Sequence, residues 1–146
     1  MHVQRLLVAV DGSANGRAAV EWSAGLAALT GARVLAVHAL GLLERDEHGD
    51  VVPAQPRRAE VEARLRSDWC APLSDAVVTH ECIVRDGDPV TVILGTADEY
   101  DVDMVVVGSR GLGGYPELLL GSTSTQVAQR SSRPVVIVPE RHAAGA

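Results

Sequence analysis

Glycines and hydroxyl side chains are concentrated in residues 108–124, which read Gly-Ser-Arg-Gly-Leu-Gly-Gly-Tyr-Pro-Glu-Leu-Leu-Leu-Gly-Ser-Thr-Ser. Glycine has no side chain, so the backbone of such a stretch can approach a ligand closely and adopt positive φ angles. Ser122, Thr123 and Ser124 add hydroxyl groups where a helix could begin. The free amides at a helix N-terminus attract anions, and phosphate above all. We therefore interpret the stretch as a phosphate-binding loop for a nucleotide.

The segments on either side place this loop at the edge of a sheet. The preceding residues 103–107 form an apolar run bounded by an aspartate and a glycine, which is typical of a strand buried on both faces. The following residues 123–130 can form a helix. In an open α/β sheet, such a strand-to-helix junction lies at the carboxyl end of the strand, where ligands bind.

The rest of the chain alternates in the same way. Apolar runs predict strands at residues 4–10, 33–40, 77–84, 101–107 and 135–138, and the segments between them predict four helices. This pattern indicates a single-domain α/β fold over residues 1–140. We expect a doubly wound, Rossmann-like parallel sheet of five strands in the order 3-2-1-4-5, with helices on both faces. Residues 141–146 are small and polar, and we expect a disordered tail there.

Local signals mark several helix ends. Ser13, with Asn15 as an alternative, is a candidate N-cap of the first helix, and Gly31 a candidate stop. Asp88 and Pro89 fit the N-cap and first position of a later helix. The polar residues 41–56 predict a mobile loop, which could serve as a lid, as a partner contact or, more simply, as a solvated connection.

Composition excludes several classes of protein. The 146 residues carry a formal net charge of −6, which argues against binding nucleic acid or a membrane surface. All 13 residues counted as Lys or Arg are arginine, so the chain has neither a Walker-type nor a catalytic lysine. Cys70 and Cys82 stand in unrelated contexts without metal-ligand spacing, and we interpret them as reduced, partly buried thiols. Without a signal peptide or a membrane-length apolar run, we expect a cytoplasmic protein.

One spacing is specific to a known family. Two residues separate Gly108 from Gly111, nine separate Gly111 from Gly121, and Ser122 follows directly. This arrangement resembles the nucleotide motif of the universal stress protein family. The resemblance extends to residues 8–13, 37–39, 87–89 and 134–138 in the right order, and so covers nearly the whole chain.

The resemblance implies the ATP-binding branch of that family, with the triphosphate on the glycine loop and on the Gly-Ser pair that opens the last helix. It implies that Asp11 contacts the ribose or its neighbourhood and that the backbone of Ala39 meets the adenine. Mg²⁺ is a further candidate cofactor. It also implies a homodimer formed by antiparallel pairing of Val135–Val138. The candidate nucleotide-binding residues are Ala9, Asp11, Gly12, Ala39, Gly108, Ser109, Arg110, Gly111, Gly113, Gly114, Gly121, Ser122 and Thr123.

Several of these residues also have a simpler structural interpretation. Asp11 could cap the first helix or shape its turn instead of contacting ribose, and Arg110 could bind phosphate or equally point to solvent. Thr123 stands where many family members carry an aliphatic residue, and could contact phosphate or cap the helix. Glu117 could reach Mg²⁺, although a solvent-facing glutamate is the simpler expectation. We interpret His38 as a buried histidine with satisfied hydrogen bonds.

Three functions are open at this point. The first is an ATP-binding stress-response regulator that senses nucleotide and hydrolyses ATP slowly at most, because no conspicuous base accompanies the loop. The second is a dimeric interaction module of the same fold that binds no nucleotide. The third, an adenylyl transferase, is disfavoured because the chain lacks a His-x-Gly-His signature and a lysine.

Overall fold

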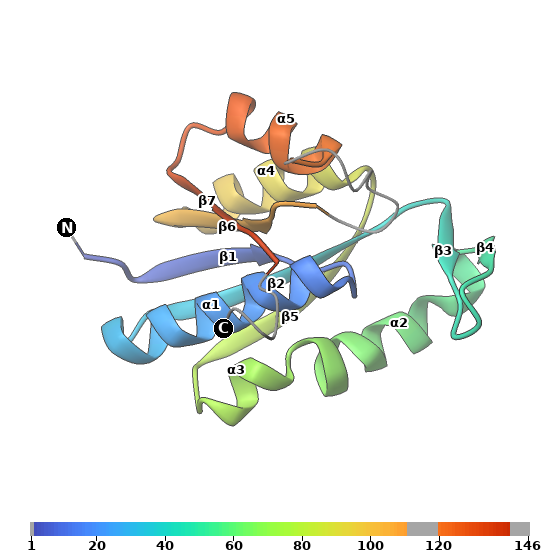
Figure 1. Cartoon of the computed structure of the whole chain (residues 1–146), viewed down its shortest axis with the longest axis horizontal. Helices are drawn as coiled ribbons and strands as arrows, with labels where there is room; N and C mark the ends of the chain where they lie inside the picture. The colour runs from blue at the N-terminus through green and yellow to red at the C-terminus, as the bar shows by residue number, and fades with distance from the viewer. Residues whose placement is uncertain (1, 111–119, 141–146) are drawn as a thin grey trace.

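The computed structural model describes residues 2–110 and 120–140. Five of its strands form one parallel sheet in the order β5-β2-β1-β6-β7 (Figure 1). These are β1 (Arg5–Ala9), β2 (Arg33–Leu40), β5 (His80–Asp86), β6 (Met104–Gly108) and β7 (Val135–Val138). Counted along the chain, this is the predicted order 3-2-1-4-5, which is therefore confirmed. The third predicted strand begins and ends later than expected, and lies at an edge of the sheet.

Helices cover both faces of this sheet, as predicted (Figure 1). Leu6 and Val8 of β1 pack in one core with side chains of α1 and α3, whereas Leu7 points to the other core, with side chains of α4 and α5. This alternation is the two-residue period of a strand buried on both faces. The helical elements are α1 (Ala14–Thr30), η1 (Gln55–Arg57), α2 (Arg58–Arg64), η2 (Leu65–Trp69), α3 (Ala71–Asp75), α4 (Pro89–Tyr100) and α5 (Ser122–Arg130).

The predicted helix ends are confirmed where a local cap defines them. The Ser13 hydroxyl oxygen accepts the Gly16 N–H at 3.0 Å and so begins α1. Gly31 ends the same helix in the left-handed region at φ 77°. The Asp88 carboxylate accepts the Thr91 N–H at 3.1 Å, and Pro89 opens α4. These caps fix where the chain turns after β1 and β5.

The helix predicted between the second and third strands is not continuous. Leu65–Trp69 is π-helical, and the Cys70 N–H donates to the Leu65 carbonyl at 2.9 Å. Pro72 has no N–H with which to continue the α-helical pattern, so the chain starts a new helix, α3. The break brings Trp69 to the inner side of the segment, where its ring centroid lies 5.2 Å from that of His38.

Residues 41–56 are not the irregular loop that their polar composition suggested. They contain an antiparallel hairpin of β3 (Leu43–Arg45) and β4 (Val51–Pro53). Its turn is closed by the Gly49 N–H, which donates to the Asp46 carbonyl at 3.0 Å, and Gly49 has φ 84°. The Asp46 carboxylate accepts the His48 and Asp50 N–H groups, each at 2.9 Å. Aspartate at the first position and glycine at the fourth are typical of such a turn.

The two cysteines, which the sequence placed in unrelated contexts, lie next to each other in the structure. Both are free thiols, but their Sγ atoms lie 3.4 Å apart across the space between η2 and β5. The sequence could not show this contact, because one cysteine follows an irregular helix and the other lies on the edge strand.

Within residues 2–110 and 120–140, no helix is both long and apolar enough to cross a bilayer. The predicted site residues Gly111, Gly113 and Gly114, the alternative metal contact Glu117 and the predicted tail 141–146 lie outside the described residues.

Candidate nucleotide-binding site

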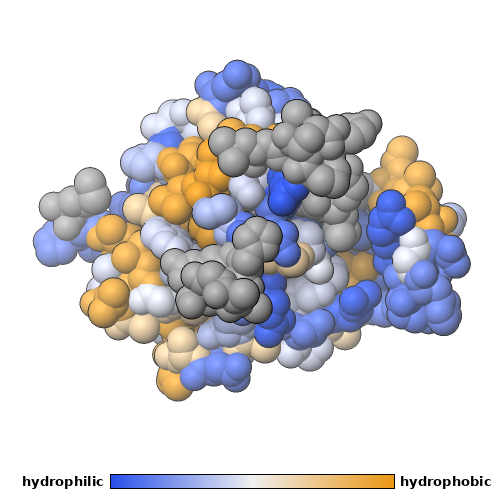
Figure 2. Space-filling model, viewed as in Figure 1, coloured by the Kyte–Doolittle hydropathy of each residue, from blue (hydrophilic) through white to orange (hydrophobic). Residues whose placement is uncertain are grey.

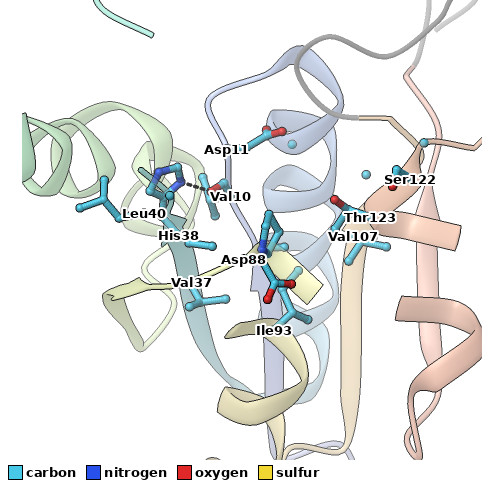
Figure 3. Close-up of a pocket in the computed structure, with 18 of the residues that line it drawn as sticks. Val10, Asp11, Val37, His38, Leu40, Asp88, Ile93, Val107, Ser122 and Thr123 are labelled. Carbon is cyan, nitrogen blue, oxygen red and sulfur yellow. Dashed lines mark hydrogen bonds between the residues drawn. The ribbon is translucent and has the colours of Figure 1, made fainter. Parts of the chain in front are cut away.

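A cleft of about 1150 Å³ runs along the carboxyl edge of the sheet (Figure 3). The ends of β1, β2 and β6 line its floor, the start of α5 borders one side, and the hairpin β3–β4 borders the other. β1 lies between β2 and β6: the chain passes from β1 to β2 and β5 on one side, and then crosses from β5 to β6 on the other side of β1. Such a switch point is where open α/β sheets leave a crevice for ligands.

Most of the described residues predicted from the sequence line this one cleft. They come from β1, β2, β6 and the start of α5, which are far apart in the chain. The lining residues among them are Ala9, Asp11, Ala39, Gly108, Arg110, Gly121, Ser122 and Thr123. Gly12 and Ser109 are not among the lining residues. Figure 3 shows Asp11 on one side of the cleft and Ser122 and Thr123 on the opposite side.

The start of α5 presents backbone amides to the cleft. Its N-cap is Gly121, at φ −80° and ψ 174°, and no side-chain hydrogen bond caps the helix. The first-turn N–H groups are therefore not occupied by an N-cap side chain. Gly121 itself plays another part, because its own N–H donates to the Ser109 carbonyl at 2.6 Å. The Ser124 hydroxyl donates to the same carbonyl at 2.8 Å.

Gly108 and Ser109 hold the sheet against α1. A Cβ on Gly108 would lie 2.7 Å from the backbone carbon and oxygen of Asn15. The Asn15 side-chain amide donates to the Ser109 hydroxyl oxygen at 2.9 Å, and both of these side chains are buried. The glycine after β6 is thus required for close packing of helix against strand, a role that the sequence did not separate from ligand approach.

Asp11 shapes the turn after β1, which is one of the two roles that the sequence left open for it, and it also lines the cleft. Its Oδ1 atom accepts the Ser13 N–H at 3.0 Å and the Ser13 hydroxyl at 2.5 Å. A Cβ on Gly16 would lie 2.6 Å from the same oxygen, so a larger residue there would displace this carboxylate. The turn therefore fixes where the carboxylate lies at the cleft.

Gly12 faces away from the main cleft and toward Trp69. It has φ 80°, and a Cβ there would lie 2.8 Å from the Trp69 ring. Both the positive φ and the close approach of the indole require glycine at this position. The residue lines a smaller cleft of about 140 Å³ together with Trp69.

His38 anchors the hairpin to the sheet. Its buried ring places Nδ1 2.7 Å from the Val10 carbonyl oxygen and Nε2 3.2 Å from the Glu44 carboxylate of β3. Burial alone would lower the pKa of His38, but the hydrogen bonds to Glu44 and Val10 outweigh burial and raise the pKa. The interpretation of His38 as a buried histidine with satisfied hydrogen bonds is confirmed.

The two sides of the cleft differ in charge. On the side of β2 and β5, Asp88 caps α4, and hydrogen bonds from Thr91 lower its pKa. Arg110 lies on the side of α5, where its Nη2 is 3.9 Å from the Glu140 carboxylate. The side of α5 combines hydroxyl groups, helix amides and a guanidinium, so an anionic ligand group is better accommodated there. Among the described residues, no cluster of His, Cys, Asp and Glu side chains is suited to hold a metal ion.

Sequence reasoning missed the wall opposite α5. It consists of hairpin residues and of the turn that precedes α4. Gly87, Asp88 and Pro89 were recognised as a landmark but not assigned to the site, whereas the hairpin carries no motif that could have revealed its position. The missed lining residues include Gly16, Leu42, Leu43, Glu44, Arg45, Val51, Asp86, Gly87, Asp88, Pro89 and Ile93.

The parallel sheet, its strand order and the crevice at its switch point define a Rossmann-like domain of the nucleotide-binding type. The sequence model of the Universal stress protein family matches residues 2–139. The chain belongs to the universal stress protein family.

Two curated relatives illustrate the range of similarity. A universal stress protein of Thermus aquaticus is 33% identical over 135 residues, which span 91% of this chain and 96% of that protein. Universal stress protein YxiE of Bacillus subtilis is 48% identical over 61 residues, but the match covers only 42% of this chain and 41% of YxiE.

Solved structures of the family share the fold. A universal stress protein crystallised in complex with cAMP is 29% identical, with a TM-score of 0.76 over 97% of this chain and all of the other. A universal stress protein from Archaeoglobus fulgidus in complex with dAMP is 23% identical, with a TM-score of 0.65 over 94% of this chain and 99% of the other. Both of these structural neighbours thus bind adenine nucleotides.

Proposed function

We propose that this chain is a stress-response regulator of the ATP-binding branch, and that its cleft holds ATP with the phosphates at the start of α5. The observation that carries the proposal is the glycine N-cap of α5. Because Gly121 has no side chain, the first-turn amides meet the cleft beside the hydroxyls of Ser122 and Thr123. Free amides at a helix N-terminus form a binding site for phosphate.

The backbone at the end of β2 suits the edge of an adenine ring. The Val37 carbonyl accepts the Val10 N–H from the side of β1, whereas the Leu40 carbonyl accepts the Gly87 N–H from the side of β5. Polar groups of alternate residues in a parallel strand point to opposite sides. The N–H and C=O of Ala39 therefore point toward the side of β1. Because β1 ends at Ala9, which pairs with Val37, no residue of β1 lies opposite Ala39.

The size and the lining of the cleft also fit a nucleotide. Its volume of about 1150 Å³ is slightly above the range of roughly 300–1000 Å³ that is typical of small-molecule sites, so the cleft has room for a whole nucleotide. Val37 and Ile93 provide an apolar surface below the strand ends, and Asp11 supplies a carboxylate for a ribose hydroxyl (Figure 3). The two structural neighbours that hold cAMP and dAMP support an adenine ligand. Mg²⁺ would enter with the phosphates of ATP.

The test is a thermal melt of the purified chain with and without ATP and Mg²⁺. Ligand at 100 times its Kd stabilises the folded state by about 2.7 kcal/mol, which corresponds to a rise in Tm of roughly 5–10 °C for a domain of this size. AMP and cyclic AMP, melted in parallel, show whether the additional phosphates contribute. An unchanged Tm at millimolar ATP would contradict the proposal.

We propose that occupancy of the cleft, not turnover, is the signal. The cleft is bordered by α5 and by the hairpin, so a bound nucleotide would alter the surface offered to a regulatory partner. Hydrolysis is expected to be far slower than the roughly 10 s⁻¹ that is typical of enzymes. Release of ADP at roughly 10 s⁻¹ would identify an ATPase instead. Rapid release of AMP and pyrophosphate would identify an adenylyl transferase.

We also propose a homodimer formed through β7, which is an edge strand of the sheet. The carbonyls of Pro134 and Val138 accept the N–H groups of Val105 on β6 and of Ser109 directly after it. Even-numbered residues of β7 therefore pair with β6, and the polar groups of Val135 and Ile137 point toward the open edge. An open row of donors and acceptors is a template for pairing with a second copy.

Replacing Ile137 with proline is expected to convert the dimer to a monomer. Proline removes the outward N–H, while the groups that pair with β6 belong to its neighbours. Ile137→Ala is the matched control, since it removes the same packing against the core of α4 and α5 but keeps the N–H. Sedimentation equilibrium measures both variants. A dimeric Ile137→Pro variant, or equal dissociation of the two, would contradict pairing through this strand.

An interaction module without nucleotide remains the second candidate function. One observation favours it: Leu42, Leu43 and Val51 on the hairpin are 90%, 60% and 55% exposed. Figure 2 shows the resulting apolar area at the hairpin end of the molecule. A protein that forms the dimer but whose Tm does not respond to any adenine nucleotide would support this candidate.

A further inference from the structure

Two cysteines that take no part in the candidate nucleotide site lie in contact. Cys70 follows η2, at the start of α3, and is fully buried, whereas Cys82 is partly exposed on the edge strand β5. Their Sγ atoms are 3.4 Å apart, and both are free thiols. The sulfur atoms would have to approach by about 1.4 Å to reach the disulfide bond length of roughly 2.05 Å.

We propose that Cys70 and Cys82 form a reversible redox site that reacts with small organic disulfides to give an intramolecular disulfide. The Cys82 thiolate attacks one sulfur of the small disulfide, forms a mixed disulfide and releases one small thiolate. The Cys70 sulfur then loses its proton and attacks the Cys82 sulfur, which releases the second small thiolate. Two protein thiols are oxidised and one small disulfide is reduced to two thiols, so that electrons and atoms balance.

The surroundings of the two sulfur atoms assign their order of reaction. The hydrogen bond shared with Cys70 lowers the pKa of Cys82 to about 7; desolvation and Glu81 oppose this shift, while His80 and Arg66 support it. The same hydrogen bond and burial raise the pKa of Cys70. Cys82 is therefore the exposed nucleophile, and Cys70 is the buried thiol that resolves the mixed disulfide.

The disulfide would join two separate parts of the fold. Only 12 positions separate the cysteines along the chain, but one follows the break in the helical segment and the other lies on a sheet strand. Trp69, which directly precedes Cys70, contacts the turn at Gly12 and the ring of His38. Oxidation would therefore tie this helical segment to β5 beside the residues that shape the end of β1.

The test is the intact mass of the chain after incubation with oxidised glutathione and acid quenching. We expect the wild-type protein to lose two hydrogen atoms, to carry no glutathione and to resist alkylation in denaturant until a reductant is added. The oxidised form should melt roughly 5 °C or more above the reduced form, since cross-linking restricts the unfolded chain. Cys70→Ala should stop at the glutathione adduct on Cys82, and Cys82→Ala should not react.

Three results would overturn the proposal: a stable glutathione adduct on the wild-type protein, alkylation of both cysteines in denaturant after the incubation, or disulfide-linked dimers on a non-reducing gel. The wild-type mass decides the matter even if a variant folds poorly. The pH dependence of Cys82 alkylation gives a separate check, because the apparent pKa should rise from about 7 when Cys70 is replaced by alanine, which removes the hydrogen bond. An unchanged pH profile would show that Cys70 does not activate Cys82.

Discussion

Replacing Gly121 with aspartate is expected to abolish the stabilisation of the protein by ATP while leaving the fold intact. Gly121 has φ −80°, so its backbone conformation accepts any residue. An aspartate at the N-cap would accept hydrogen bonds from the first-turn N–H groups of α5 and stabilise the helix by roughly a few tenths of a kcal/mol relative to glycine. The same carboxylate would occupy the proposed phosphate site with a negative charge, so that a polyanion would be repelled.

The matched control is Gly121→Asn, which has nearly the same size and capping ability but no charge. Without nucleotide, both variants should melt at or slightly above the Tm of the wild type. With ATP, the asparagine variant should keep a reduced shift, because its side chain competes for amides only, and the aspartate variant should show none. A full shift in the aspartate variant would place the phosphates elsewhere in the cleft.

Replacing Gly108 with alanine is expected to lower the free energy of unfolding by about 2 kcal/mol, within the range typical of overpacking. The new Cβ would lie 2.7 Å from the backbone of Asn15, and a backbone cannot move aside as a flexible side chain can. Residues after β6 would then separate from α1 or strain the buried hydrogen bond between Asn15 and Ser109. We expect Tm to fall by roughly 4–8 °C.

Gly95→Ala provides the control for this variant. Gly95 lies inside α4 with nothing within 4 Å of its Cβ position, so alanine there should raise the free energy of unfolding by roughly 0.5–1 kcal/mol. The opposite signs of the two alanine substitutions distinguish close packing from an ordinary helix effect. Denaturant titration of both variants measures them, and a Gly108→Ala variant as stable as the wild type would contradict the packing role.

The sequence predicts those parts of the fold that depend on interactions between residues close together in the chain. Continuous apolar runs mark strands that are buried on both faces, and Ser13 and Asp88 mark helix starts because their side chains bond amides a few residues away. The hairpin could not be predicted in this way. Its strands of three residues each are too short to show an alternation of apolar and polar side chains, and the hairpin is held by the tertiary contact between His38 and Glu44.

The candidate site could likewise be predicted only where it depends on local sequence. The motif predicts the side of the cleft formed by Gly108 and by the start of α5, because its glycine and hydroxyl spacing is local. The opposite wall, including Leu43 of the hairpin, is assembled only by folding. The contact between Cys70 and Cys82 also depends on tertiary structure, since nothing in the sequence specifies how the helical segment lies on β5.

The most direct test of the proposed function is a crystal structure of the protein grown or soaked with ATP and Mg²⁺. We predict phosphate oxygens within hydrogen-bond distance of the Ser122 and Thr123 amides, and the adenine edge against the N–H and C=O of Ala39. A cleft that stays without nucleotide at saturating ATP, or phosphates that lie away from the start of α5, would contradict the account.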